Sequence, residues 1–79
     1  MLVRNVVGLG RVIRLRRKEA GLTADEAARL AGVSRRLLIE LERGRRPNVG
    51  AAAVFRILEL LGLRVDVEPR GGAGGKSGV

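Results

Sequence analysis

Apolar residues recur at intervals of three and four positions along most of the chain, a period typical of helices with one buried face. The first such segment covers residues 9–20 and is followed by Gly21, a favourable C-cap. The apolar residues that share its inner face are Leu9, Val12, Ile13 and Ala20. Residues 1–8 stand before this segment, and we expect them to form an N-terminal arm.

Two further segments follow, separated by a very short turn. Thr23 and Glu26 have the spacing of a capping box at the start of one helix, and Gly32 is placed to end it in the left-handed conformation. Ser34 then caps the next helix, and Gly44 ends it. Two short helices joined by a turn that contains glycine predict a helix-turn-helix motif.

A fourth helix is predicted from Asn48, a good N-cap, to Leu61. Its apolar arc is broader than the stripe that a single small core covers. Phe55, the only aromatic residue of the chain, is expected to lie in the core. We therefore expect no base-stacking platform of the kind that binders of RNA and single-stranded DNA use.

After Gly62 the apolar period changes to two, which predicts a half-buried strand over residues 63–68. The alternating residues are Leu63, Arg64, Val65, Asp66, Val67 and Glu68. A lone strand leaves its backbone hydrogen-bonding groups unpaired, so this strand needs a partner. Two partners are open, namely the same strand of a second chain and the segment around Leu2 and Val3 of the same chain.

The fold class predicted from these elements is all-α, with four to five helices and one short C-terminal β-strand. Residues 9–69 are expected to form one domain between the N-terminal arm of residues 1–8 and a tail of residues 70–79. The tail has almost no apolar residues to bury, and we expect it to be flexible.

Charge and composition restrict the classes of function and of binding partner that this domain can have. The chain has 16 Lys and Arg against 8 Asp and Glu, a net charge of +8, which favours an anionic partner such as nucleic acid. It has no histidine and no cysteine, so we expect neither an enzyme nor a metal- or cofactor-binding protein. No apolar stretch approaches the length that spans a bilayer. We expect no membrane partner and a cytoplasmic, nucleoid-associated location.

Residues 24–44, with the turn sequence AGVS and the closing ERG, resemble the helix-turn-helix of the phage-repressor-like (XRE) regulators. The likeness extends to LGRVIRLRRKEAGLT at residues 9–23 and to LGLRVDVEP at residues 61–69. That ending, together with SRRLLIELERG, is most similar to HipB-type antitoxins, which are partners of HipA-type kinase toxins. The resemblance implies a lambda-repressor-like domain over residues 9–69 that binds DNA and dimerises by pairing residues 63–68 of two chains.

The resemblance also implies that the third helix and its flanks contact a DNA duplex. The residues implied to reach base edges are Arg35, Arg36, Ile39 and Glu40. The residues implied to contact phosphates are Thr23, Ser34, Arg43, Arg45 and Arg46. Arginine suits the O6 and N7 acceptors of guanine, whereas phosphate contacts position a protein without selecting sequence. Glu40 has a second interpretation, in which it orients Arg36 instead of accepting a hydrogen bond from cytosine.

Arg17 and Glu42 occupy the positions at which the resemblance implies a structural ion pair between the first and third helices. The chain departs from the family pattern at Ala24, where a glutamine is common. It departs again at Leu37 and Ile39, where many members have small polar residues facing the groove. Apolar side chains there either meet thymine methyl groups or mark a surface used for binding protein.

The function implied by the resemblance is that of a homodimeric repressor of a palindromic operator. In this interpretation the protein is an antitoxin that represses its own operon and sequesters a HipA-type kinase toxin. Two alternatives stay open. One is a protein-interaction module that chiefly neutralises a toxin and binds DNA weakly, and the other is a stand-alone repressor without a toxin. The resemblance implies no cofactor.

Overall fold

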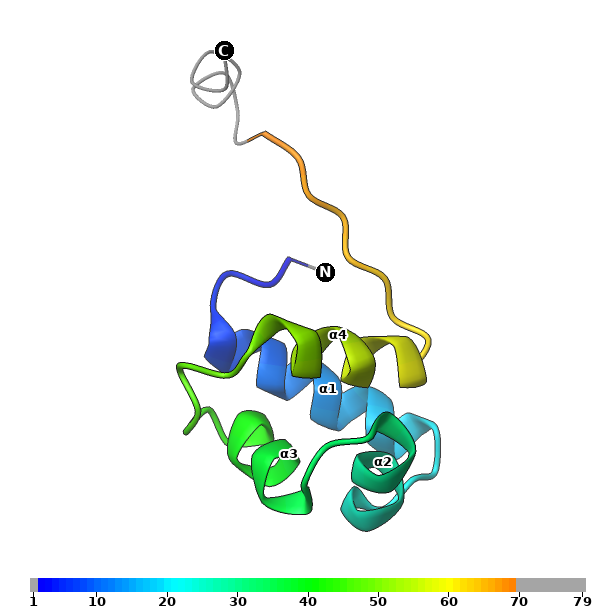
Figure 1. Cartoon of the computed structure of the whole chain (residues 1–79). Coiled ribbons are helices and arrows are strands. Elements are labelled where there is room, and N and C mark those ends of the chain that lie inside the picture. The colour runs from blue at the N-terminus through cyan, green and yellow to red at the C-terminus, as the bar shows by residue number, and fades with distance from the viewer. Residues whose placement is uncertain (1, 70–79) are drawn as a thin grey trace.

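The computed structural model describes residues 2–69, in which the regular structure consists of four helices (Figure 1). These are α1 (Val6–Glu19), α2 (Ala24–Ala31), α3 (Arg35–Glu42) and α4 (Ala51–Leu60). In Figure 1, α4 lies across α1, and α2 and α3 lie beneath them. The predicted tail of residues 70–79 lies outside the described residues. Within residues 2–69, no helix combines the length and the apolar content that a membrane crossing requires.

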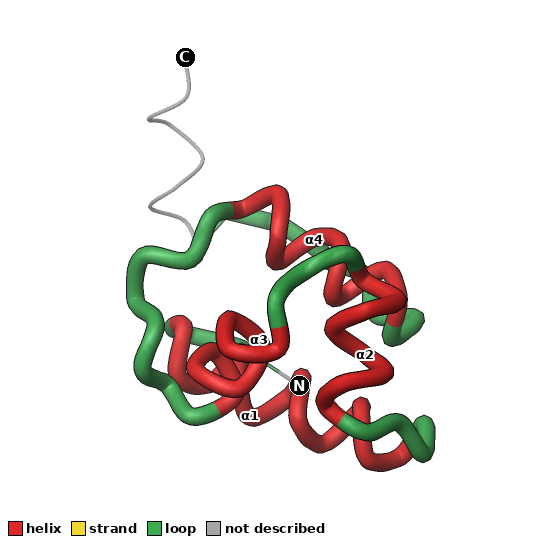
Figure 2. Tube along the Cα trace, turned by 60° about the horizontal axis from the view of Figure 1, so that its bottom comes forward, coloured by secondary structure: helices red, strands yellow, loops and turns green. Residues whose placement is uncertain are grey.

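The helix-turn-helix unit of α2 and α3 forms as the sequence predicts (Figure 2). The Thr23 hydroxyl accepts a hydrogen bond from the backbone N–H of Glu26 at 3.1 Å, and the Glu26 carboxylate accepts one from the backbone N–H of Thr23 at 2.8 Å. Hydrogen bonding to Thr23 lowers the pKa of Glu26. Gly32 ends α2 with a φ of 74°, and the Ser34 hydroxyl accepts from the backbone N–H of Leu37 at 3.0 Å. These caps satisfy backbone groups on both sides of the turn.

The first helix begins at Val6 instead of Leu9, so the predicted arm of residues 1–8 is too long. Asn5 caps the helix, because its side-chain oxygen accepts a hydrogen bond from the backbone N–H of Gly8 at 2.9 Å. Val6 packs against the core in the first turn. Because glycine has a low helix propensity, Gly8 in this turn made the start of α1 difficult to predict from the sequence.

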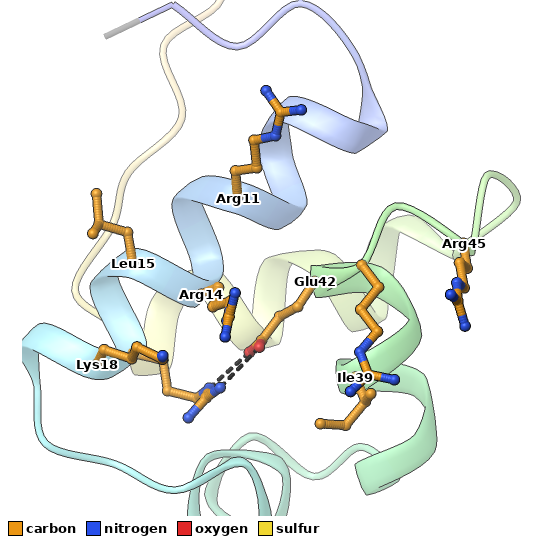
Figure 3. Close-up of a pocket in the computed structure, with 9 residues that line it drawn as sticks. Arg11, Arg14, Leu15, Lys18, Ile39, Glu42 and Arg45 are labelled. Atoms are coloured by element: carbon orange, nitrogen blue, oxygen red, sulfur yellow. Dashed lines mark hydrogen bonds and ion pairs between the residues drawn. The ribbon is translucent and has the colours of Figure 1, made fainter.

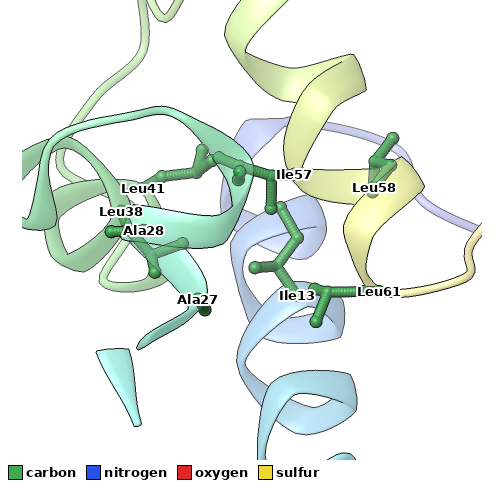
Figure 4. Close-up of a cluster of buried hydrophobic side chains, with 9 residues drawn as sticks. Ile13, Ala27, Ala28, Leu38, Leu41, Ile57, Leu58 and Leu61 are labelled. Atoms are coloured by element: carbon green, nitrogen blue, oxygen red, sulfur yellow. The ribbon is translucent and has the colours of Figure 1, made fainter. Parts of the chain in front are cut away.

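The hydrophobic core lies where the four helices meet (Figure 4). Its largest fully buried side chains are Ile13, Leu38, Leu41 and Ile57. The α2 helix contributes only small side chains to this cluster, namely Ala27, Ala28 and Ala31. Because the distance between packed helices depends on the side chains at the contact, these alanines let α2 lie close to α3 and α4.

The helices α1 and α3 cross at Gly10, which is buried. A Cβ atom at this position would collide with the carbonyl oxygen of Leu41 and would lie 3.0 Å from the Leu41 carbonyl carbon. It would also lie 3.2 Å from the Cα of Glu42. The backbones of α1 and α3 therefore touch, and only a residue without a side chain fits between them.

A buried ion pair between Arg17 and Glu42 fastens the same two helices. The Arg17 Nε donates to Glu42 Oε2 at 2.7 Å and the Arg17 Nη2 donates to Glu42 Oε1 at 2.9 Å. The two side chains are only 11% and 3% exposed. The Arg17 Nη1 also donates to the Leu22 carbonyl oxygen at 2.9 Å, which ties the α1–α2 connection to the pair. The hydrogen bonds to Glu42 raise the pKa of Arg17 against the opposing effect of burial, so Arg17 stays charged.

The fourth helix differs from its prediction at its start and in one core residue. Gly50, and not Asn48, is the N-cap, and it makes no side-chain hydrogen bond. Phe55 is 56% exposed, so its prediction as a core residue is wrong. The inner face of α4 is occupied by Ile57 and Leu58, which leaves Phe55 at the side of the helix.

The predicted strand over residues 63–68 is not formed in the described chain, where residues 63–69 have neither helix nor strand. A strand requires a neighbouring strand for its backbone groups, and the segment at Leu2 and Val3 does not supply one. Leu63 packs against the core, whereas Val65 and Val67 are 48% and 90% exposed. The Leu63 backbone N–H donates to the Leu58 carbonyl oxygen at 2.9 Å, so within the described chain it is Val65 and Val67 whose apolar side chains stay uncovered.

Replacing Gly10 by alanine is expected to lower the free energy of unfolding by about 1–3 kcal/mol, because α1 and α3 must separate to admit a methyl group. Helix propensity alone predicts a gain of about 1 kcal/mol, so the sign of the change is informative. Gly8→Ala is the matched control, since the nearest atom to a Cβ there is Asn5 Oδ1 at 3.6 Å. Urea unfolding measures both variants, and a stabilising Gly10→Ala would contradict the close crossing.

A double-mutant cycle tests the Arg17–Glu42 pair. Arg17→Met or Glu42→Leu alone should cost about 3–5 kcal/mol, because each leaves the other charge buried without its partner. The Arg17→Met, Glu42→Leu double variant should lose much less than the sum of the single losses. The exposed pair Arg35 and Asp25 serves as the control, with a coupling below about 1 kcal/mol. Additive single effects at Arg17 and Glu42 would rule out a buried pair.

Candidate nucleic-acid interface

The outward face of α3 is defined by the residues that the core leaves uncovered. The buried residues of the helix are Leu38, Leu41 and Glu42. The exposed and half-buried residues on its other side are Arg35, Arg36, Ile39, Glu40 and Arg43. All four residues predicted to reach base edges therefore lie on one face of α3, together with Arg43.

Leu37 does not belong to this face. It is half-buried and packs against the core, so the prediction that it faces a DNA groove is wrong. Ala24 also packs against the core at the start of α2. Ile39 is thus the apolar side chain of α3 that reaches the outer surface, and it lies on the side of α3 that faces α1.

Carboxylates form ion pairs with two arginines of the outward face, Arg35 and Arg36. Arg35 forms an exposed ion pair with Asp25 of α2 at 3.0 Å. Glu40 is bonded twice, because Arg46 Nη1 donates to its Oε1 at 2.7 Å and Arg36 Nε donates to its Oε2 at 3.2 Å. These two hydrogen bonds, that of Arg46 first, lower the pKa of Glu40. The structure thus contains the contact in which Glu40 orients Arg36.

Asp25 is a residue of this face that the sequence reasoning missed. It stands in the first turn of α2, where an acidic residue is usual because of the helix dipole, and that ordinary role gave no reason to connect it with α3. The short turn brings the starts of α2 and α3 close enough for the ion pair with Arg35.

The two capping hydroxyls predicted to contact phosphate lie at exposed helix N-termini. Thr23 and Ser34 each accept one hydrogen bond from the backbone of their own helix. A hydroxyl that accepts in this way still has its hydrogen to donate. Exposed N–H groups and the helix dipole make such termini favourable for phosphate oxygens.

The loop after α3 carries further cations. Gly44 adopts a φ of 70°, and the backbone N–H of Arg45 donates to the Glu40 carbonyl oxygen at 2.8 Å, which turns the chain sharply at the end of α3. Arg43 and Arg45 are exposed, and neither forms an ion pair with another residue in the part of the chain that the structure describes. Arg46 differs, since it is bonded to Glu40.

A basic groove runs between α1 and the end of α3 (Figure 3). We use the name α1–α3 groove for the surface lined by Arg11, Arg14, Leu15, Arg17, Lys18, Ile39, Glu42, Arg43 and Arg45. The Arg17–Glu42 pair, marked by dashed lines in Figure 3, lies between the two helices. The sequence showed only that the cations of α1 lie off its apolar face, because the groove requires the fold to bring α1 beside α3.

Comparison with known proteins agrees with this geometry. Residues 8–70 match the family described as helix-turn-helix domain. The chain is also similar to a protein of Sinorhizobium fredii named uncharacterized HTH-type transcriptional regulator y4mF, with 34% identity over 65 residues. That alignment covers 82% of this chain and 84% of the relative. The match covers α2, α3, α4 and α1 from Gly8 onward, and the chain belongs to the helix-turn-helix domain family.

Proposed function

We propose that the protein is a transcription repressor that binds duplex DNA in a sequence-specific manner. The observation that carries this proposal is the outward face of α3, which joins a capped helix-turn-helix to a cluster of arginines. Membership of the helix-turn-helix domain family supports DNA-binding transcription regulation in general. The relative in Sinorhizobium fredii bears the name of a transcriptional regulator, which agrees with the same function.

In this proposal α3 enters the major groove with its N-terminal residues toward the base edges. Arg35 and Arg36 each have a guanidinium that matches the O6 and N7 acceptors of guanine. Both are exposed and held by single carboxylates, so they exchange these partners for bases at small cost. Glu40 and Ile39 complete the set of side chains that face the bases.

Phosphate contacts position the domain on the duplex. We assign this role to the N-terminal hydroxyls and to the cations at the end of α3. The residues concerned are Thr23, Ser34, Arg43, Arg45 and Arg46. They lie on both sides of the base-contacting residues along the chain, as expected for a helix that sits between two phosphate strands.

We propose further that the protein binds its operator as a homodimer. A hollow lined by Glu59 and the apolar residues Phe55, Leu58, Leu63 and Val65 supports this, because the described chain leaves Phe55 and Val65 half exposed. In the proposed dimer, residues 63–68 of two chains pair antiparallel. If the twofold axis lies near Asp66, then Arg64 stands opposite Glu68 and Val65 opposite Val67.

Both of these cross-strand pairings are favourable, at about 0.2–1 kcal/mol each. The symmetry then places two recognition helices about 34–36 Å apart on a palindromic operator.

The finer assignment, an antitoxin of the HipB type within the XRE regulators, rests on the resemblance of residues 34–44 and 61–69. It is supported by the same exposed C-terminal segment, which is free to pair with another chain. The test is to identify the gene beside this one and to purify both products together. A kinase-like partner that copurifies and loses activity supports the antitoxin, and a stand-alone regulator follows if no such gene is present.

The base-reading assignment predicts two classes of arginine. On a duplex selected by the protein itself from a random library, Arg35→Ala or Arg36→Ala should weaken binding by about 1–3 kcal/mol and relax selectivity at one base pair. Arg45→Ala should keep selectivity and reduce the slope of log K against log salt by about one unit. Fluorescence anisotropy at several salt concentrations measures both. Equal losses on selected and random duplexes for all three variants would contradict the assignment.

The dimer predicts that Val65→Asp combined with Val67→Asp gives a monomer, because two charges would then face the partner strand without compensation. Both side chains are substantially exposed in the described chain, so the monomer should keep its fold. Removal of residues 70–79 is the control and should leave the dimer intact. Sedimentation equilibrium at micromolar concentration distinguishes the species, and a monomeric unsubstituted chain would overturn the proposed dimer.

A further inference from the structure

We use the name base-reading face for the outward face of α3, formed by Arg35, Arg36, Ile39, Glu40 and Arg43. The α1–α3 groove lies beside this face and carries more positive charge. Arg11, Arg14 and Lys18 occupy positions i, i+3 and i+7 of α1, a spacing that puts them along one side of the helix. All three are exposed. Arg43 and Arg45 supply the opposite side from the end of α3.

The cations of this groove differ from those of the base-reading face in their partners. Arg35 and Arg36 are bonded to Asp25 and Glu40. None of Arg11, Arg14, Lys18, Arg43 and Arg45 forms an ion pair with any residue among positions 2–69. Carboxylates therefore neutralise part of the charge of Arg35 and Arg36 in the free protein, whereas the five cations of the groove have no such partner within the described residues.

The acidic residue in the groove does not cancel this charge. Both carboxylate oxygens of Glu42 accept hydrogen bonds from Arg17, and the Glu42 side chain is 3% exposed. The pair is neutral as a unit and forms a firm floor between α1 and α3. An anion in the groove thus meets five cations and no free carboxylate.

We propose that the α1–α3 groove binds the phosphate backbone that flanks the major groove contacted by α3. This inference rests on the proposed DNA-binding function and extends the DNA contact surface onto α1. Ile39 and Arg43 belong to both surfaces, so the groove is continuous with the base-reading face. An acidic protein segment could bind the groove whether or not the groove adjoined the base-reading face. Binding of such a segment is the alternative outcome of the test.

The dimensions of the groove fit a DNA strand. Seven residues of α-helix rise about 10 Å, so the cations from Arg11 to Lys18 extend over that length. One strand of B-DNA carries a phosphate at every nucleotide, so a row of this length can contact the phosphates of successive nucleotides. Leu15 also lines the groove and offers apolar surface to deoxyribose.

The test compares two variants of the full chain that lose the same charge. Arg14→Gln with Lys18→Gln removes two cations of the groove, and Arg29→Gln with Arg56→Gln removes two exposed cations of α2 and α4 that do not line it. Circular dichroism and thermal unfolding check that both variants keep the fold. Binding to a random-sequence duplex of about 25 base pairs is followed by fluorescence anisotropy from low to moderate salt.

The groove variant should reduce the slope of log K against log salt by about two units, since each lost phosphate contact contributes about 0.9. The α2–α4 variant should leave the slope within about half a unit of the unsubstituted chain. The same slope for both variants would overturn the proposal. Polyglutamate serves as the probe for an acidic protein segment, and a groove variant that keeps its slope on DNA but loses binding to polyglutamate would also overturn the proposal. If the unsubstituted chain binds no duplex, the proposed function itself fails, and this result is distinct from the other two.

Discussion

The crossing of α1 and α3 is the contact on which the rest of the structure depends. Gly10 lets the two backbones touch, and the Arg17–Glu42 pair locks them in that position. The same contact turns Leu38 and Leu41 inward and leaves the opposite face of α3 to solvent. It also brings the cations of α1 beside the end of α3. The crossing of these two helices therefore both exposes the outward face of α3 and forms the α1–α3 groove.

The division of charge between the two surfaces suggests how attraction and selection are separated. In the proposed function, the uncompensated cations of the groove attract any duplex through phosphate contacts, which carry no sequence information. The arginines of the base-reading face are held by Asp25 and Glu40, so they contribute less to this general attraction. In the proposed function these exposed ion pairs are weak, so Arg35 and Arg36 exchange them at small cost for a base edge that offers a comparable pair of acceptors.

Local signals in the sequence predicted the helix-turn-helix unit, because the caps at Thr23 and Ser34 and the glycine turn involve residues close together in the chain. The Arg17–Glu42 pair joins residues 25 positions apart, and only the family resemblance pointed to it. Phe55 was predicted as buried because it belongs to a broad apolar arc of α4, and residues 63–68 were predicted as a strand because apolar residues alternate there. Burial of the whole arc and pairing of a strand both need further chain to pack against. The described residues of one chain do not supply it, so Phe55 stays exposed and residues 63–68 form no strand.

The central claim is that duplex DNA contacts the starts of α2 and α3, the loop after α3 and the groove-facing side of α1. A titration of the ¹⁵N-labelled full chain with a selected duplex, followed by amide chemical shifts, tests this claim most directly. The account predicts shift changes concentrated at Thr23, at residues 34–46 and at Arg11, Arg14 and Lys18, with little change in the middle of α4. Changes confined to α4 and residues 63–68, or no change on adding duplex, would contradict it.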